Sequence, residues 1–148
     1  MSGFGDPALL DNSAWARVLL GRLPAAANTR WRQALRSGEI RACPPFVLEA
    51  LYSARDGRAY VELAEELGAL PQAPAHEATW RLAREAQGDL ASSRAVSHRV
   101  KPIDVLVAAI AHHERLAVLH YDRDYDVLAE HSRLRFPSVW IAPAGSID

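Results

Sequence analysis

Short apolar runs alternate with longer stretches of mixed polarity along the chain. Each run ends at polar or turn-forming residues, which is typical of a buried strand. The first run, residues 8–10, stops at the polar residues 11–13. Strands are therefore predicted at residues 8–10, 40–43, 69–70, 117–120 and 138–141, of which 69–70 is the weakest.

The stretches between these runs carry apolar residues three and four positions apart, the spacing of an amphipathic helix. Pro44 and Pro102 stand where two of the helices begin, since proline is tolerated in a first turn. The predicted helices cover residues 14–20, a segment around 31–35 that ends near residue 38, and residues 44–52, 60–67, 76–90, 102–110 and 125–130, with a loop at 92–101. Strands that alternate with helices predict one α/β domain over residues 1–148 with a mainly parallel sheet.

The composition excludes several classes of protein. With 148 residues, 49% hydrophobic and 24% charged, the chain has the size and residue usage of one globular domain. Cys43 is the only cysteine, so neither an internal disulfide nor a cysteine-based zinc site can form. The N-terminal segment does not resemble a signal peptide, and the longest apolar run, 105–111, is too short to span a bilayer. We expect a cytoplasmic protein that is not associated with membranes.

The charge balance leaves nucleic-acid binding open. The net charge of −1 gives no sign of a strongly basic surface. Of the 17 basic residues, all except Lys101 are arginine. Arginine suits bidentate contacts with phosphate, so this bias is compatible with a local arginine patch. A GC-rich genome is the simpler explanation.

Acidic residues recur next to the predicted strands. Asp11 ends the first strand, Glu49 lies one turn into the helix after the second, and Asp104 lies in the first turn of the helix before residues 117–120. Asp122 and Asp124 follow that strand directly. Ligands bind at the carboxyl ends of parallel strands, where these carboxylates would repel one another. Mg²⁺ or Mn²⁺, which prefer oxygen ligands, would remove that repulsion.

Each acidic residue also has a purely structural interpretation. Asp11 and Ser13 are suited to cap the following helix, and the helix dipole favours Asp104 in a first turn. Glu49 fits a solvated helix face, and the two aspartates after residue 120 are common turn formers. Asp124 is the weakest member, because it can equally cap the helix that follows it. The joint position of all of them favours the metal site.

The histidines give less information. His112 and His113 do not fit the helical zinc-protease pattern and are predicted on a solvated helix face. His120 is interpreted as a packed residue at a strand end. His98 and its neighbouring arginines fit either a phosphate-facing segment or an ordinary polar loop. The sequence lacks both a glycine-rich phosphate loop and the Gly-x-Ser-x-Gly motif of serine hydrolases.

Four segments in this order and spacing resemble a PIN domain, and in detail the VapC toxins of bacterial toxin–antitoxin pairs. They are residues 10–15, 48–54, 102–109 and 119–126. The resemblance covers most of the chain, from about residue 9 to residue 141. It implies a three-layer α/β/α sandwich and a metal-dependent ribonuclease. Two positions depart from the family pattern: Asn12 stands where threonine or serine is frequent, and His120 stands where threonine is frequent.

The resemblance also implies the residues that carry the chemistry. Asp11, Glu49, Asp104 and Asp122 match the family's acidic quartet of catalytic metal ligands. Ser13 would support Asp11, and Asp124 would be a further contributor. The expected cofactor is Mg²⁺ or Mn²⁺, which would activate water to hydrolyse phosphodiester bonds.

The implied partners are RNA, a second copy of the chain in a homodimer, and a small VapB-like antitoxin that blocks the cleft. Single-stranded or loop RNA is the expected substrate, because its backbone is accessible. We expect an apolar surface near Trp15 and the helix of Trp31 to bind the antitoxin, with Trp15 in the core as the alternative. Two other functions stay open: an inactive PIN-fold interaction scaffold, against which the intact quartet argues, and a metal-dependent DNA nuclease.

Overall fold

The computed structural model describes residues 3–94, 96 and 99–147 of the chain. Four strands and seven helices occur in this part. They are β1 (Ala8–Leu10), α1 (Asn12–Leu20), α2 (Ala25–Arg36), β2 (Ile40–Arg41), α3 (Pro44–Tyr52), α4 (Gly57–Gly68), α5 (Glu77–Ser92), α6 (Pro102–Glu114), β3 (Ala117–His120), α7 (Asp124–His131) and β4 (Ser138–Trp140). The alternation of strands and helices predicted from the sequence is confirmed.

The strands form one parallel sheet in the order β2-β1-β3-β4. The register pairs Ala8 with both Ile40 and Ala117, and Val118 with Ser138. Parallel neighbours require crossover connections, and the helices provide them. Since all four strands run the same way, their carboxyl ends meet at one edge of the sheet.

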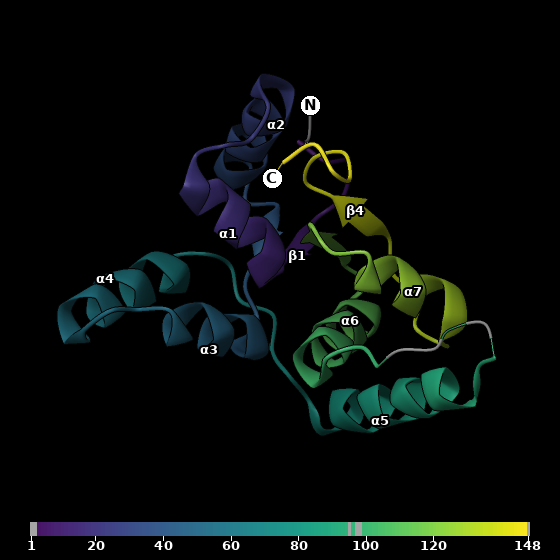
Figure 1. Cartoon of the computed structure of the whole chain (residues 1–148). Coiled ribbons are helices and arrows are strands. Elements are labelled where there is room, and N and C mark those ends of the chain that lie inside the picture. The colour runs from purple at the N-terminus through teal and green to yellow at the C-terminus, as the bar shows by residue number, and fades with distance from the viewer. Residues whose placement is uncertain (1–2, 95, 97–98, 148) are drawn as a thin grey trace.

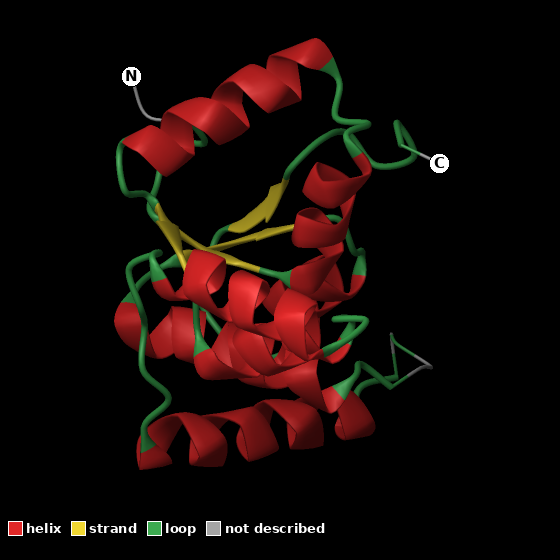
Figure 2. Ribbon diagram, turned by 90° about the vertical axis from the view of Figure 1, so that its left-hand side faces the viewer, coloured by secondary structure: helices red, strands yellow, loops and turns green. Residues whose placement is uncertain are grey.

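Helices cover both faces of the sheet, which gives the predicted three-layer α/β/α sandwich (Figures 1 and 2). α1 and α2 lie on one face, and α6 lies on the other with α5 packed on its outer side. The run Val105 to Ala111 in α6 is buried on every side, because the sheet covers one flank and neighbouring helices cover the rest. α6 is thus a central helix, buried more completely than an amphipathic surface helix.

The prediction of a strand at residues 69–70 is wrong. The amides of Ala69 and Leu70 donate to carbonyls of the last turn of α4, so these residues continue the helix end. A single parallel bridge forms two residues later, between Ala42 and Gln72. Pro71 directly after Leu70 prevents the helix from continuing.

The alternative that placed Trp15 in the core is confirmed, while Leu19, Leu20 and Leu35 form exposed apolar positions on α1 and α2. Trp15 and Trp31 are 6% and 5% exposed, and their ring centroids lie 6.5 Å apart. The two rings pack against each other where α1 meets α2, so they belong to the core. Within the described residues, no helix is long and apolar enough to cross a membrane. His98 lies outside the described residues.

Candidate metal centre

Asp11 directly follows β1 and caps α1 at the carboxyl edge of the sheet. Its Oδ2 accepts hydrogen bonds from the Ser13 amide at 2.9 Å and from Ser13 Oγ at 2.5 Å. Ser13 Oγ in turn accepts from the amide of Tyr121 at 2.9 Å, which links α1 to the segment after β3. Asp11 is buried despite its charge. Asp11 therefore caps α1 through Oδ2 while its carboxylate also lies at the carboxyl edge of the sheet.

Two further carboxylates approach Asp11 from different helices. Glu49 lies on α3 and Asp104 in the first turn of α6. One ligand oxygen from each of Asp11, Glu49 and Asp104 lies within 4.8 Å of the others. Asp11 and Asp104 are buried, and Glu49 is half-buried. The fold thus brings together three residues that are 38 to 93 positions apart in sequence.

A second group shares Asp104 with the first. Oxygens of Asp104, Asp122 and Asp124 also lie within 4.8 Å of one another. The Asp122 side chain accepts a hydrogen bond from the amide of Asp124 at 2.9 Å, which is the turn-forming contact expected for an aspartate there. Every acidic residue singled out in the sequence therefore lies in one of two overlapping carboxylate groups.

The electrostatics of the cluster oppose full ionisation. Burial raises the pKa of Asp104 to about 7, and repulsion from Asp11, Asp122 and Glu49 adds to the effect. Burial also raises the pKa of Glu49, again with repulsion from Asp11. Lys101, at the start of α6, partly offsets both shifts by attraction.

One buried oxygen of the cluster has no hydrogen-bond partner among the described residues, Oδ2 of Asp104. An unpaired buried carboxylate oxygen is costly, and a cation beside it would remove that cost. The candidate metal ligands in the two groups are all carboxylate oxygens, the ligand type that hard divalent cations prefer. The residues present therefore fit a divalent metal ion.

Tyr125 lies beneath the cluster and was not identified from the sequence as a site residue. Its phenol donates to Asp11 Oδ1 at 2.6 Å and lies 3.4 Å from Asp104 Oδ1. Complete burial and the two carboxylates raise its pKa well above the usual value, so the phenol keeps its proton. In the sequence, Tyr125 is recognisable only as a core residue, because it lies three positions before Leu128 in a short predicted helix.

His120 occupies the position where the family pattern often has threonine, and it organises a buried network. Its Nδ1 accepts from the Asp122 amide at 3.1 Å, which places the proton on Nε2. Nε2 lies 2.7 Å from Ser138 Oγ, and Ser138 donates to Asp126 at 2.7 Å. The ring stacks on Tyr125, and burial lowers the pKa of His120 to about 4. The prediction of a packed strand-end histidine is confirmed.

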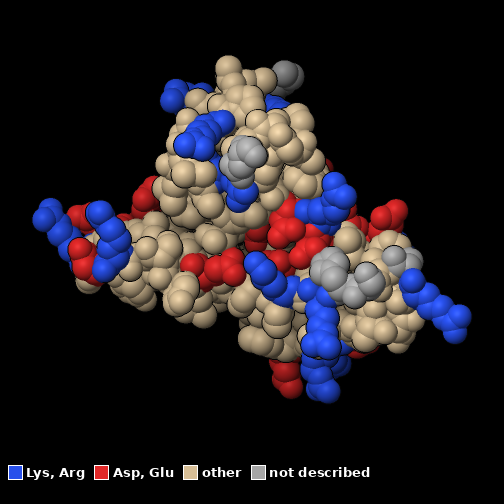
Figure 3. All heavy atoms as spheres, in the orientation of Figure 1, with Lys and Arg blue, Asp and Glu red and all other residues tan. Residues whose placement is uncertain are grey.

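Acidic and basic side chains are unevenly distributed on one face of the molecule. Figure 3 shows acidic side chains gathered near the centre of this face, where the upper and lower parts of the molecule meet. Lysine and arginine side chains lie around this centre rather than within it. Although the net charge is only −1, the charged side chains on this face are arranged as an acidic centre with basic side chains around it.

Comparison with known proteins decides the family. The sequence matches the PIN domain family over residues 8–131. The chain belongs to the PIN domain family. It is 36% identical to Ribonuclease VapC18 of Mycobacterium tuberculosis over 139 residues, or 93% of this chain and 97% of that protein. Its identity to Ribonuclease VapC17 of the same organism is 34%, over 82% of this chain and 86% of that one.

The fold of this PIN domain is similar to that of a chain in the crystal structure of DNA-bound VapBC from Salmonella typhimurium. The TM-score is 0.68 at 15% identity, and the match covers 93% of this chain and 99% of that chain. A chain of FitAcB from Neisseria gonorrhoeae matches with a TM-score of 0.60 at 18% identity, over 90% of this chain and 96% of that one. With the sequence relatives, these matches make the chain a VapC-type PIN domain.

Proposed function

We propose that this PIN domain is a metal-dependent endoribonuclease and the toxin of a VapBC-type toxin–antitoxin pair. The observation that carries the proposal is Asp104, which belongs to both carboxylate groups and whose buried Oδ2 has no hydrogen-bond partner among the described residues. An inactive interaction scaffold would gain nothing from burying carboxylates that repel one another. The ribonuclease relatives support the choice of reaction.

The two carboxylate groups would provide two overlapping positions for Mg²⁺ or Mn²⁺. Asp11, Glu49 and Asp104 would hold one ion, and Asp104, Asp122 and Asp124 would hold a second. When bound, a divalent cation supplies positive charge at the scissile phosphate and makes water more acidic. The catalytic residues of the proposal are Asp11, Glu49, Asp104 and Asp122.

Other side chains prepare the carboxylates for this role. Ser13 holds Oδ2 of Asp11 and Tyr125 holds Oδ1, so the Asp11 carboxylate has a fixed orientation. His120 holds the amide of Asp122 and thereby the turn that follows β3. Lys101 favours the ionised forms of Glu49 and Asp104. These contacts reduce the reorganisation needed when a metal ion and substrate bind.

The proposed substrate is the phosphodiester backbone of single-stranded or loop RNA. The basic side chains around the acidic centre in Figure 3 suit phosphates that flank the scissile bond. In-line attack of water on phosphorus would leave a 5′-phosphate and a 3′-hydroxyl. Because water is the nucleophile, no serine, cysteine or histidine nucleophile is needed.

A cleavage assay on total RNA tests the proposal. Wild-type protein should cleave with Mg²⁺ or Mn²⁺, lose activity in EDTA, and leave 5′-phosphate ends on mapping. Asp104→Asn should reduce cleavage by at least about 100-fold while staying folded, because it removes the charge shared by both metal positions. Glu66→Gln is the matched control, since Glu66 is exposed and lies in neither carboxylate group.

Three outcomes would contradict the ribonuclease assignment. Cleavage that persists in EDTA would show that the reaction does not require a metal ion. Equal cleavage by wild type and Asp104→Asn would show that the carboxylate cluster is not the catalytic site. Activity on single-stranded DNA with none on RNA would favour the DNA nuclease.

The proposed partners are a small antitoxin and a second copy of this chain. The solved neighbours are VapBC and FitAB assemblies, which supports an antitoxin partner. α3 and α4 project from the body of the molecule (Figure 1), and several of their apolar side chains are exposed. Leu48 and Tyr52 on α3 are 68% and 91% exposed, and Tyr60 and Val61 on α4 are also exposed. Leu48 precedes Glu49, so an antitoxin on this surface would lie beside the carboxylate cluster.

A further inference from the structure

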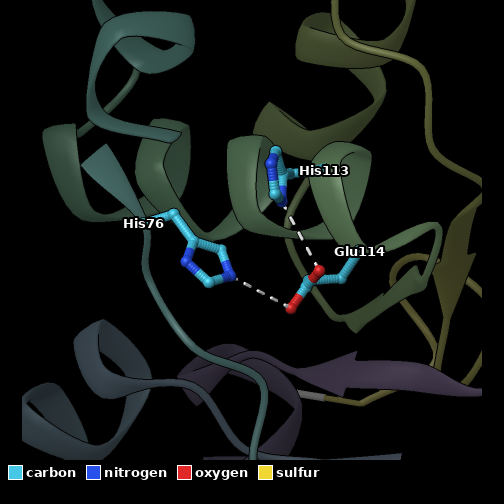
Figure 4. Close-up of side chains that lie close together, drawn as sticks. All are labelled: His76, His113 and Glu114. Carbon is cyan, nitrogen blue, oxygen red and sulfur yellow. Dashed lines mark ion pairs between the residues drawn. The ribbon is translucent and has the colours of Figure 1, made fainter. Parts of the chain in front are cut away.

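Three metal-binding side chains converge at the end of α6 that is opposite to the carboxylate cluster. His76 precedes α5, while His113 and Glu114 belong to the last turn of α6. Figure 4 shows both imidazole rings directed at the carboxylate of Glu114. His76 Nε2 lies 3.8 Å from Glu114 Oε1, and His113 Nδ1 lies 3.4 Å from Glu114 Oε2. One ligand atom from each of the three residues lies within 4.8 Å of the others.

These separations suit ligands of one metal ion better than hydrogen-bonded pairs. An N–H···O hydrogen bond is about 2.7–3.2 Å long, shorter than either contact. Ligands at about 2.1 Å around a tetrahedral ion lie about 3.3–3.5 Å from each other. The observed 3.8 and 3.4 Å, one to each oxygen of the Glu114 carboxylate, are close to that spacing, so a small movement of these partly exposed side chains would bring both imidazoles and the carboxylate around one ion.

We propose that His76, His113 and Glu114 form a Zn²⁺ site that fastens the start of α5 to the end of α6. Two imidazoles and one carboxylate are ligands that Zn²⁺ takes readily, whereas Mg²⁺ prefers oxygen ligands throughout. All three side chains are partly exposed, so water can fill the fourth position. The site has the donor set of a three-ligand zinc centre with one open position.

The local structure holds the ligands in place, and the three side chains make no hydrogen bond to another described residue. His76 occupies the N-cap position of α5, yet its side chain makes no capping hydrogen bond. Its carbonyl accepts from the amide and hydroxyl of Thr79, which fixes the backbone. α6 ends after Glu114 with Arg115 in the left-handed region at φ 58°, so the two adjacent ligands lie on its final turn. The rings of His76 and His113 lie 5.0 Å apart between centroids.

This site is separate from the proposed nuclease centre. Asp104 and His113 are nine residues apart in one helix, or roughly 14 Å at 1.5 Å per residue. The two sites also differ in ligand type, since one contains only carboxylates and the other contains two imidazoles. Zn²⁺ bound between α5 and α6 would stabilise the helix that carries Asp104 without contacting the nuclease centre.

Zinc titration of the purified full chain tests the proposal. The Asp104→Asn variant serves as background, because it removes the carboxylate shared by both groups of the acidic cluster. Isothermal titration with Zn²⁺ should give one bound ion per chain at micromolar metal, and Zn²⁺ should raise the melting temperature. His76→Ala and His113→Ala, each added to this background, should weaken binding more than about tenfold. Co²⁺ should give the strong visible absorption of four-coordinate ligation, which is lost in both histidine variants.

His131→Ala is the matched control. His131 also lies beside a glutamate, with Nε2 3.7 Å from Glu130 Oε2, but it belongs to no three-residue group among the described residues. It should leave Zn²⁺ affinity unchanged. Equal Zn²⁺ affinity in the background, His76→Ala and His113→Ala proteins would overturn the proposal, as would no binding at micromolar Zn²⁺. Circular dichroism and metal-free melting would show that the variants are folded, and these readouts do not depend on nuclease activity.

Discussion

The Tyr125 hydroxyl donates a 2.6 Å hydrogen bond to Asp11 Oδ1, although the two residues are 114 positions apart. The bond joins the first turn of α7 to the end of β1, and both side chains are buried. Burial and the neighbouring carboxylates raise the pKa of the Tyr125 phenol, which favours the protonated form that donates to the carboxylate. One oxygen of Asp11 is thus fixed by α7, and the other is fixed by Ser13.

Tyr125→Phe should weaken metal binding and RNA cleavage about 10–100-fold without abolishing either, because the Asp11 carboxylate loses an orienting donor. The loss of a buried hydrogen bond to a charged group should lower stability by about 1.5–3 kcal/mol. Cleavage kinetics at several Mn²⁺ concentrations and urea unfolding measure the two effects. In the control Tyr121→Phe, the lost hydroxyl contacts the Ile147 backbone and, among the described residues, no carboxylate, so the metal dependence should not change. Identical metal dependence in Tyr125→Phe and wild type would contradict the positioning role.

In metal-free protein, Asp104 should make stability fall as pH rises from about 4 to 7. Its pKa is about 7 in the fold against 3.8 ordinarily, so between these values the folded state binds more protons than the unfolded state. Asp104→Asn removes this penalty and should be more stable than wild type by about 1–3 kcal/mol at pH 8. Urea unfolding in EDTA from pH 4 to pH 8 measures the difference.

The stability of wild type must be compared with that of Asp104→Asn, because His120 changes the free energy of unfolding in the opposite direction over the same pH range. Its pKa is lowered to about 4, so its contribution to stability grows as pH rises towards its ordinary value of 6.5. Since both proteins contain His120, its effect cancels in the difference between them. A stability difference that does not change with pH would mean that Asp104 is ordinarily ionised in the fold.

The sequence predicted the sheet and the acidic cluster because both depend on local patterns. Short apolar strands between helices imply a parallel sheet, and residues after parallel strands meet at one edge. This reasoning placed Asp11 and Asp122 at that edge, and the structure puts both in the carboxylate groups. The weak strand at residues 69–70 failed because an apolar pair before proline fits a helix end as well as a strand.

Other features depend on contacts between distant residues and have no local signal. Tyr125 differs in no visible way from a core aromatic residue, yet its hydroxyl meets two carboxylates. His76 is 37 positions from His113, so only the packing of α5 on α6 reveals that they are neighbours. The contact between Trp15 and Trp31 likewise has no local signal, since only the packing of α1 and α2 brings the two rings together.

Mn²⁺ or Mg²⁺ should raise the melting temperature of the wild-type protein. An ion that binds only the folded state adds about 2.7 kcal/mol at a hundredfold excess over Kd. The rise should be much smaller in Asp104→Asn, which lacks the carboxylate shared by both groups. Thermal scans across millimolar metal, with Glu66→Gln as control, measure the shift. Melting temperatures that do not respond to metal would contradict a preformed site.

Ser138→Ala should destabilise the fold while preserving most cleavage activity. Ser138 connects His120 Nε2 to Asp126 at 2.7 Å on each side, so the variant leaves a buried imidazole N–H without its partner. The expected loss is about 1–3 kcal/mol in urea unfolding. Ser146→Ala, at an exposed position, should have no comparable effect. Loss of cleavage at unchanged stability would instead place Ser138 in the catalytic machinery.

Expression of the wild-type chain alone should arrest bacterial growth, and co-expression of the small open reading frame beside its gene should relieve the arrest. Asp104→Asn should not arrest growth, because arrest requires cleavage. Tyr52→Glu should still arrest growth, since Tyr52 is 91% exposed and belongs to neither carboxylate group, but its arrest should resist relief. The reason is that a charge on the exposed face of α3 would be buried without a partner in the complex. Co-purification from cells that express both chains measures the interaction directly. Harmless expression of the wild type would contradict the toxin, whereas equal relief of wild type and Tyr52→Glu would place the antitoxin on another surface.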